Sequence, residues 1–251
     1  MRILVSNDDG VYSWGLHVLA ESLKKLGQVW VVAPLEEKST TGHSLTIHKP
    51  LRVHKMDTGY YGVSGSPADC VYVGIREVLG GKMPDLVVSG INRGGNLGQD
   101  VYYSGTVSAA REACILGLPA IAVSTNVDFK KKKEDKKIHF EAAGKAVVEL
   151  VRKVPLKTIP KHTLLNVNVP DLPYSKIEGF AAVRQGFRHY SGSVLRRVDH
   201  RGKPYFWIGG QYKGFRNEAG TDCKVVADNY ISVTPLQLDC TDHHFLSELE
   251  F

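Results

Sequence analysis

Short apolar runs alternate with longer segments of helical periodicity through the first half of the chain. The run Arg2–Ser6 is typical of a buried strand, and Gly15–Leu26 places apolar residues at helical spacing before Gly27. The same pattern predicts further strands over Gln28–Ala33, Asp85–Ser89 and Ala120–Ser124, and further helices over Ser66–Leu79 and Ser104–Leu116. This alternation predicts βαβ units, and therefore an α/β fold with a mostly parallel sheet and helices on both faces.

The second half of the chain changes character after one more helix and strand, expected over Glu141–Lys153 and Leu164–Val169. From about Gly179 to Pro235, short β-rich runs with glycine and aromatic residues predict hairpins rather than further βαβ units. A short terminal helix is expected within Asp242–Phe251. We therefore expect a single domain over 1–251, with a core of about 1–178 and a hairpin and oligomerisation extension of about 179–251.

Composition limits the class of protein without choosing a function. The 251 residues are 43% hydrophobic and 23% charged, which excludes disorder, collagen and coiled coil as descriptions of the whole chain. A net charge of +6 is mild, and Lys130–Lys137 is expected to be a solvated loop. No apolar run approaches the roughly 20 residues of a membrane span, and Met1–Val5 is too short for a signal-peptide core. The four cysteines form no C-x-x-C pair, which indicates reduced thiols and a cytoplasmic protein without a membrane partner.

Polar residues follow three of the expected strands, where α/β proteins bind their ligands. Asp8 and Asp9 follow the first strand, Ser39 lies in the loop after the second, and Asn92 follows Asp85–Ser89. Adjacent carboxylates repel each other unless a cation offsets their charge, and Mg²⁺ or Mn²⁺ prefers oxygen ligands. The sequence thus predicts a divalent metal site, while a simple turn or helix cap at Asp8-Asp9 is the alternative.

A glycine-rich stretch and a helix start form a second candidate site. Gly90–Gly98 holds four glycines in nine residues, and Ser104-Gly105-Thr106 opens a helix. Free backbone N–H groups at such a helix start favour phosphate, although a flexible loop with an ordinary cap is the alternative. There is no G-x-x-x-x-G-K-[ST], and no G-x-G-x-x-G follows the first strand, so a dinucleotide site is not favoured.

Several motifs together resemble the SurE family of stationary-phase survival proteins. The long ones are Ile3–Gly10, Ser89–Asn92 with Gly95–Gly98, and Tyr103–Val107, and shorter matches are Gly65–Cys70, Trp207–Gly210, Gly220–Asp222 and Ser232–Leu236. They occur in order from Arg2 to about Thr241. The resemblance implies a Rossmann-like three-layer α/β/α fold and a metal-dependent nucleotidase, with 5′- and possible 3′-nucleotidase and exopolyphosphatase activity.

The resemblance also implies roles for particular residues. It assigns one Mg²⁺ or Mn²⁺ ion per subunit to Asp8, Asp9, Ser39 and Asn92, and it assigns phosphate contacts to Asn96, Ser104, Gly105 and Thr106. The loop after the second strand departs from the family pattern at Thr40 and His43, on the substrate side of the loop, whereas Ser39 still matches the pattern. A nucleoside monophosphate is the implied substrate, without a stable nucleic-acid partner, and a homodimer or homotetramer with exchanged C-terminal segments is the implied assembly.

The expected reaction is hydrolysis of a phosphomonoester, with Asp8 and Asp9 as catalytic residues. Asp9 is the first candidate for the general base and His43 is the second. Two other classes stay open at this point. One is a phosphatase that forms a covalent aspartyl-phosphate, although Asp8-Asp9 lacks the intervening residue of Asp-x-Asp. The other is a non-enzymatic nucleotide- or RNA-binding module, suggested by the positive net charge.

Overall fold

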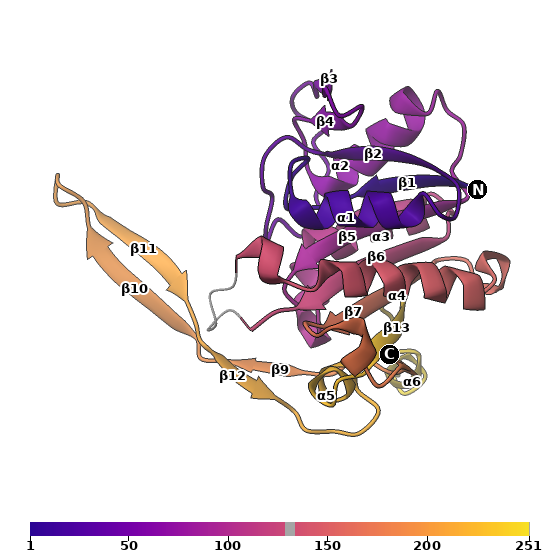
Figure 1. The fold of residues 1–251 in the computed structure, drawn as a ribbon. Helices are drawn as coiled ribbons and strands as arrows, with labels where there is room; N and C mark the ends of the chain where they lie inside the picture. The colour runs from indigo at the N-terminus through magenta and orange to yellow at the C-terminus, as the bar shows by residue number, and fades with distance from the viewer. Residues whose placement is uncertain (129–133, 251) are drawn as a thin grey trace.

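A single large sheet runs through the computed structural model, which describes residues 1–128 and 134–250 (Figure 1). Within these residues the sheet has nine strands. In spatial order they are β3 (Val53–Lys55), β4 (Tyr61–Val63), β2 (Gln28–Pro34), β1 (Arg2–Ser6), β5 (Leu86–Arg93), β6 (Ala120–Asn126), β7 (Thr163–Pro170), β13 (Ile231–Gln237) and β8 (Phe180–Ala182).

The central strands are parallel, so their carboxyl ends share one edge. β1 pairs in parallel with β2 and β5, and β5, β6 and β7 continue in the same direction. Ser6 lies opposite Ser89, and this pairing brings the residues after β1 beside the last part of β5. The exceptions are at the margins, where β13 is antiparallel to β7 and β3 is antiparallel to β4.

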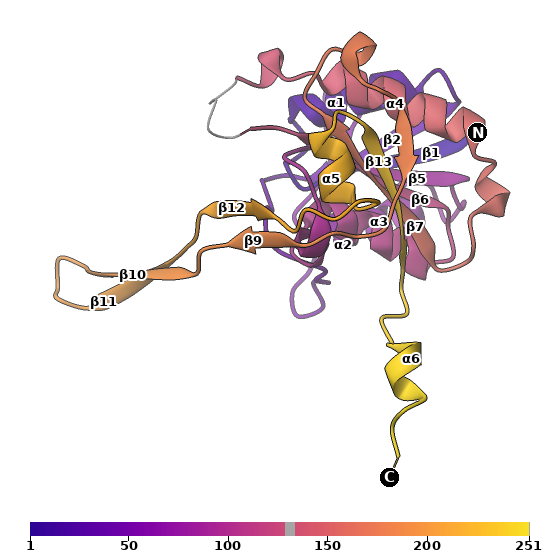
Figure 2. The same cartoon turned by 90° about the horizontal axis from the view of Figure 1, so that it is seen from below.

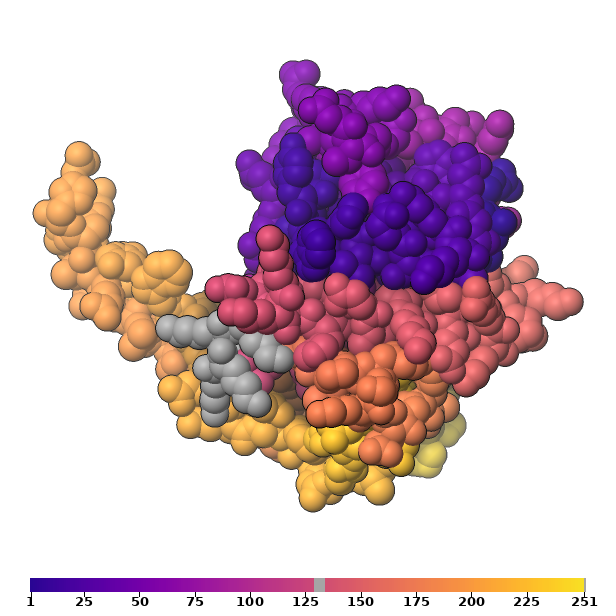
Figure 3. Space-filling model, viewed as in Figure 1, coloured from indigo at the N-terminus to yellow at the C-terminus, as the bar shows by residue number. Residues whose placement is uncertain are grey.

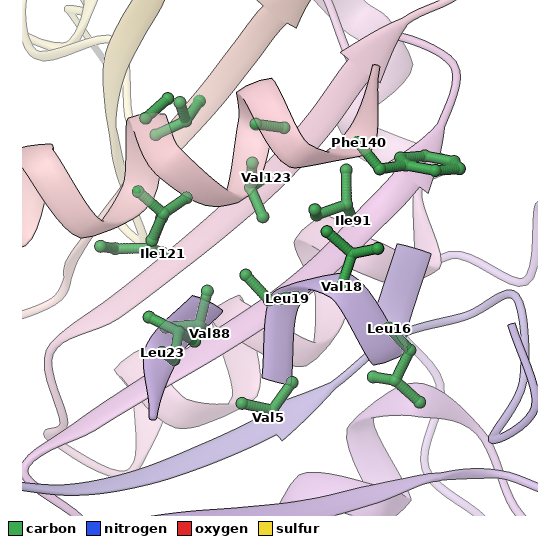
Figure 4. Packing of buried hydrophobic residues seen from close by; sticks show 14 of the residues in the cluster. Val5, Leu16, Val18, Leu19, Leu23, Val88, Ile91, Ile121, Val123 and Phe140 are labelled. Carbon is green, nitrogen blue, oxygen red and sulfur yellow. The ribbon is translucent and has the colours of Figure 1, made fainter. Parts of the chain in front are cut away.

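Helices cover both faces of the sheet, as the sequence predicts. The principal helices are α1 (Trp14–Leu23), α2 (Pro67–Val73, continued by a π-helical turn over Gly74–Val78), α3 (Gly105–Ile115) and α4 (Phe140–Lys153). Ile3 and Val5 face the cluster that includes α1 and α4, whereas Leu4 between them faces the cluster that includes α2 and α3. Figure 4 shows the first cluster, in which Leu19 and Leu23 of α1 pack over Val5 and Val88 of the strands. The three-layer α/β/α architecture is confirmed.

The strand expected over Asp85–Ser89 is longer than the sequence indicates. β5 continues to Arg93, and its pairing with β6 shifts register between Ser89 and Asn92, so that Asn92 lies opposite Ser124. The expected strand end at Ser89 is therefore wrong, because the first four residues of the glycine-rich stretch, Gly90–Arg93, belong to the strand. Gly90 adopts a φ of +137°, and a Cβ there would lie 2.3 Å from the carbonyl oxygen of Val123, so a glycine is required at this shift.

The expectation of hairpins throughout 179–235 is also only partly correct. β8 and β13 join the main sheet, and α5 (Asp222–Ala227) lies between them in sequence. Two antiparallel pairs remain outside it: β9 (Arg188–Tyr190) with β12 (Tyr212–Phe215), here called the stem, and β10 (Ser193–Val198) with β11 (Pro204–Gly209), here called the arm. The division of the chain near residue 178 stays a prediction.

The arm extends away from the body of the molecule (Figures 1 and 3). The short terminal helix that the sequence predicts is α6 (His243–Leu246), and Figure 2 shows it on a tail that also leaves the body. Lys130–Lys133 of the expected lysine loop lie outside the described residues, whereas Asp135–Lys137 forms a 3₁₀ turn. In the described ranges no helix combines the length and apolar character needed to cross a bilayer.

Candidate functional site

Asp8 and Asp9 lie in a tight turn directly after β1. The side chain of Asn7 holds this turn, because its Nδ2 donates to the carbonyl oxygen of Gly10 at 3.0 Å and to Oγ of Ser13 at 2.7 Å. Ser13, not either aspartate, caps the following helix α1. The alternative in which Asp8 or Asp9 is the helix cap is therefore wrong, and both carboxylates are available for other contacts.

Burial disfavours the charged form of both carboxylates, and the charge of Asp8 adds to this effect at Asp9. Burial, followed by the negative charge of Asp8, raises the pKa of Asp9 to about 7. Burial also raises the pKa of Asp8, against the opposing effect of a hydrogen bond from Thr106. Glu37 adds a third negative charge that acts on both. Such a group of acidic oxygens is expected where a cation is to be bound.

The N-terminus of α3 packs directly against Asp8. The hydroxyl of Thr106 donates to Oδ1 of Asp8 inside the protein. A Cβ at Gly105 would lie 2.6 Å from the Cβ of Asp8, so only glycine allows this close approach. The sequence analysis expects Gly105 and Thr106 to contact phosphate. In the structure the hydroxyl of Thr106 instead donates its proton to Asp8, a candidate metal ligand.

The loop after β2 brings Ser39 to the same edge of the sheet. Its start is tied to the turn, because the backbone N–H of Lys38 donates to the carbonyl oxygen of Asp8 at 2.7 Å. Ser39 itself is exposed, and its hydroxyl donates to Oε1 of Glu37 at 2.6 Å. The hydroxyl proton is thereby directed toward Glu37, which leaves the lone pairs of the Ser39 oxygen for another partner.

Asn92 near the end of β5 has a fixed side-chain amide. Its Nδ2 donates to the carbonyl oxygen of Gly94 at 2.8 Å, so the amide nitrogen is used within the chain and the amide oxygen is the ligand atom that remains. The next residue, Arg93, donates its backbone N–H to the carboxylate of Asp9, which lowers the pKa of that carboxyl against the effect of burial. The end of β5 is thus joined to the turn after β1.

The donor set fits a hard divalent cation. Asp8 and Asp9 supply carboxylate oxygens, and the hydrogen bonds of Ser39 and Asn92 leave an oxygen available on each. The described part of the chain holds no cluster of three or more His, Cys, Asp and Glu side chains suited to a metal, and the predicted set contains only two such residues. Oxygen donors of this kind are those that hard divalent cations prefer, whereas zinc sites in proteins usually include nitrogen or sulfur ligands.

The loop Gly94–Gly98, here called the phosphate loop, is rigidly held. Asn96 is buried; its backbone N–H donates to Oδ1 of Asn168 and its Nδ2 donates to Oγ of Ser124, each at 2.8 Å. The second proton of the Asn96 amide donates to no group in the described chain, so it is a free donor. Ser104 caps α3 by accepting a 3.0 Å hydrogen bond from the N–H of Val107, and its own proton is donated to no group in the described chain.

His43, the second candidate for the general base, is bound to a different carboxylate. Its Nε2 lies 2.8 Å from Oε2 of Glu112, a buried residue two turns into α3. The backbone N–H of Gly42 also donates to the carbonyl oxygen of Tyr103 at 3.2 Å. These contacts attach the loop that carries Ser39 to the helix that carries Thr106, which indicates a structural role for His43.

Sequence reasoning missed the residues that hold the phosphate loop from the far end of the chain. The carboxylate of Asp222 is buried and accepts from the N–H groups of Gly98 at 2.9 Å and Gly186 at 2.8 Å. Arg188 pairs with Asp100 at 2.6 Å and donates to the carbonyl oxygen of Gly95 at 3.3 Å. The motif Gly220–Asp222 was the available signal, but nothing local in it indicates a partner 124 positions away.

The comparisons with known proteins point to one family. A family described as "Survival protein SurE" matches residues 3–192. The chain is 48% identical to a Geobacter sulfurreducens protein named "5'-nucleotidase SurE" over 250 residues, covering 100% of this chain and 93% of that protein. An Aquifex aeolicus protein of the same name is 47% identical over 99% of this chain and 96% of its own length. A crystal structure of an Aquifex aeolicus protein called SurE superimposes with a TM-score of 0.85 at 46% identity, covering 99% of this chain and 98% of that one.

Proposed function

Because the chain belongs to the SurE family, we propose that it is a metal-dependent 5′-nucleotidase that hydrolyses nucleoside monophosphates to nucleoside and inorganic phosphate. The structural observation that carries this proposal is the buried Asp8-Asp9 pair, packed against the N-terminus of α3 at the carboxyl edge of the sheet. Acidic oxygens for a cation and helix N–H groups for an anion thus lie side by side.

We propose Asp8, Asp9, Ser39 and Asn92 as the ligands of one Mg²⁺ or Mn²⁺ ion. Such an ion, when bound, neutralises phosphate charge and makes a coordinated water more acidic. The Ser104 hydroxyl, the free amide proton of Asn96 and the backbone N–H of Gly105 bind phosphate oxygens, whereas the backbone N–H of Thr106, like its hydroxyl, is already hydrogen-bonded to the carboxylate of Asp8. These donors favour the transition state, in which negative charge spreads over the three equatorial oxygens.

The reaction transfers the phosphoryl group to water. A water oxygen forms a bond to phosphorus, the bond from phosphorus to the ribose oxygen breaks, and that ribose oxygen takes up a proton. Asp9 is our first candidate to accept the proton of the attacking water. His43 is less suitable, since its Nε2 is already hydrogen-bonded to Glu112 at 2.8 Å. The non-enzymatic binding module is not favoured, because the relatives are named as 5′-nucleotidases. The covalent aspartyl-phosphate mechanism is not favoured, because Asp8-Asp9 lacks the intervening residue of Asp-x-Asp.

Assembly and location complete the proposal. The arm exposes apolar side chains on a free hairpin, with Ile208 93% and Trp207 63% exposed, which supports a homodimer or homotetramer that exchanges C-terminal segments. All four cysteines lie in the described ranges and are free thiols, which supports a cytoplasmic location.

The test is release of phosphate from AMP with Mn²⁺ or Mg²⁺, with and without a chelator. We expect turnover with metal, loss of turnover with EDTA, and a loss of at least about a thousandfold in Asp8→Asn. Asp57→Asn, an exposed carboxylate in a turn, is the matched control. Full activity of Asp8→Asn in a metal-replete assay would contradict the ligand assignment.

A further inference from the structure

A cavity of about 320 Å³ lies between the phosphate loop and the stem. Leu97 of the phosphate loop and Asn126 at the end of β6 contribute to one part of its wall. Arg188, Tyr212 and Phe215 of the stem contribute to another. Its volume is in the range of cavities that hold small molecules.

The order of the strands places this cavity next to the phosphate loop. β1, β5 and β6 are neighbours, and their carboxyl ends carry in turn the two aspartates, the phosphate loop and Asn126. Asn126 also touches the loop, because a Cβ at Gly95 would lie 2.6 Å from Oδ1 of Asn126. A molecule whose phosphate lies on the loop can therefore extend away from Asp8 and Asp9 into this cavity.

The wall of the cavity suits a flat, uncharged ring. The guanidinium carbon of Arg188 lies 4.4 Å from the centroid of the Tyr212 ring, so the two groups form one stacked unit. Aromatic and guanidinium planes bind nucleobases by stacking, and an amide such as that of Asn126 offers both a donor and an acceptor to a base edge. The charge of Arg188 is balanced by Asp100 at 2.6 Å, which makes the wall a weak site for a second phosphate.

A second cavity of about 340 Å³ is lined by Asp9 itself and has different chemistry. Its lining includes Tyr12 and Trp14, but also three carboxylates, those of Asp9, Glu37 and Asp135, against the one guanidinium of Arg93. Carboxylates accept hydrogen bonds without donating them when ionised, and a wall rich in them favours water and cations over a neutral ring. The cavity beside the stem is lined by one carboxylate, that of Asp128, together with Arg188 and two aromatic rings, and it is thus the better place for a base.

We propose that the cavity between the phosphate loop and the stem is the nucleobase subsite, with the Arg188–Tyr212 stack and Asn126 in contact with the base. This inference rests on the proposed nucleotidase function. It makes Tyr212 and Arg188 determinants of the preference for nucleotides over phosphomonoesters that lack a base. It also gives the stem a direct role in substrate binding, in addition to its contacts with the phosphate loop.

The experiment compares AMP with ribose 5-phosphate, which has the same phosphate ester and no base, on the full Mn²⁺-loaded protein. We expect a lower KM for AMP than for ribose 5-phosphate in the unaltered protein. Tyr212→Ala is expected to raise the KM for AMP about fivefold or more relative to the KM for ribose 5-phosphate, since base stacking is lost. Tyr212→Phe keeps the ring and is expected to restore the preference.

Tyr12→Ala is the matched control, because Tyr12 is an exposed tyrosine in the other cavity. We expect it to keep the preference for AMP. An equal rise in KM for both substrates in Tyr212→Ala would overturn the subsite and leave Tyr212 with a purely structural role. A selective loss of AMP binding in Tyr12→Ala would move the base to the carboxylate-lined cavity and would also overturn the proposal.

Misfolding of a stem variant does not prevent the test. In the unaltered protein, inhibition of ribose 5-phosphate hydrolysis by adenosine reports on the subsite independently. We expect adenosine to inhibit competitively. Absence of inhibition at millimolar adenosine overturns the proposal. Failure of the unaltered protein to hydrolyse either substrate contradicts the proposed function. Hydrolysis of both with equal KM overturns only the subsite.

Discussion

The Nε2 atom of His43 lies 2.8 Å from Oε2 of Glu112, and this contact joins the loop that carries Ser39 to the interior of α3. Glu112 is 3% exposed, so its carboxylate depends on this partner for compensation. A histidine held in this way positions a loop, whereas a general base must reach the attacking water. The two roles predict different kinetics.

His43→Ala is expected to keep kcat within about threefold at saturating Mn²⁺, whereas loss of a general base costs about 10²–10⁴-fold. The concentration of Mn²⁺ for half-maximal activity is expected to rise, because Ser39 is less well held, and stability is expected to fall by about 1–3 kcal/mol as Glu112 loses its partner. The measurements are a Mn²⁺ titration of activity and urea unfolding. His48→Ala, at an exposed histidine nearby, is the control, and a hundredfold drop in kcat in His43→Ala alone would restore the general-base role.

The hydrogen bond from Thr106 to Asp8 predicts an effect on metal affinity. Thr106→Val keeps the shape of a fully buried side chain but removes the donor that lowers the pKa of Asp8. Loss of a residue that orients a ligand typically weakens metal binding about 10–100-fold, and we expect a loss in this range. Thermal shift during a Mn²⁺ titration measures it. Thr106→Ser retains the hydroxyl and is expected to bind nearly as the unaltered protein does; equal affinity in Thr106→Val would show that the bond does not orient Asp8.

The raised pKa of Asp9 predicts that the metal-free protein gains stability when this charge is removed. Burial and the charge of Asp8 raise the pKa of Asp9 from 3.8 to about 7, so folding favours the protonated carboxyl. The cost of the ionised form is absent below about pH 4, grows as pH rises, and is complete above about pH 7. With EDTA present, Asp9→Asn is thus expected to be more stable by about 2 kcal/mol or more at pH 8, and by much less at pH 5.

Urea unfolding at the two pH values checks this, with the exposed Asp57→Asn as the control. If Asp9→Asn gains the same stability at pH 5 and pH 8, the gain does not come from removing the ionised carboxylate of Asp9. Asp9→Asn is also expected to abolish activity. The carboxylate of Asp9 thus lowers the stability of the metal-free protein but is required for catalysis.

Much of the fold could be predicted because its signals are local. The strand Arg2–Ser6 is found with the expected bounds, and Ser104 caps α3 where a serine before a helix indicates a cap. The site is less predictable because its supporting contacts are distant in sequence: Thr106 meets Asp8 across 98 positions and Asp222 meets Gly98 across 124. The pattern of β13 is that of any short apolar strand, so only tertiary pairing decides that it joins β7 rather than a hairpin.

The exposed arm predicts the state of assembly. Ile208 and its cross-strand partner Val194 are 93% and 63% exposed, and a second chain in the proposed assembly would cover them. Ile208→Asp is expected to reduce the mass measured by light scattering toward that of one chain, with an unchanged circular dichroism spectrum. Lys25→Glu, a charge change on the body, is the control. An unaltered mass for Ile208→Asp would exclude this face of the arm from the subunit interface.

The position of Asp222 and β13 late in the sequence has a consequence for biosynthesis. Translation delivers the aspartates and the phosphate loop first, but the carboxylate that holds Gly98 and the strand that covers the edge of β7 emerge only much later. A nascent chain that has reached β7 thus carries an unpaired strand edge, which is prone to wrong pairing until the ribosome has released α5 and β13. Ribosome-bound chains of this protein are for that reason expected to need protection from a chaperone, and to hydrolyse no nucleotide before their release.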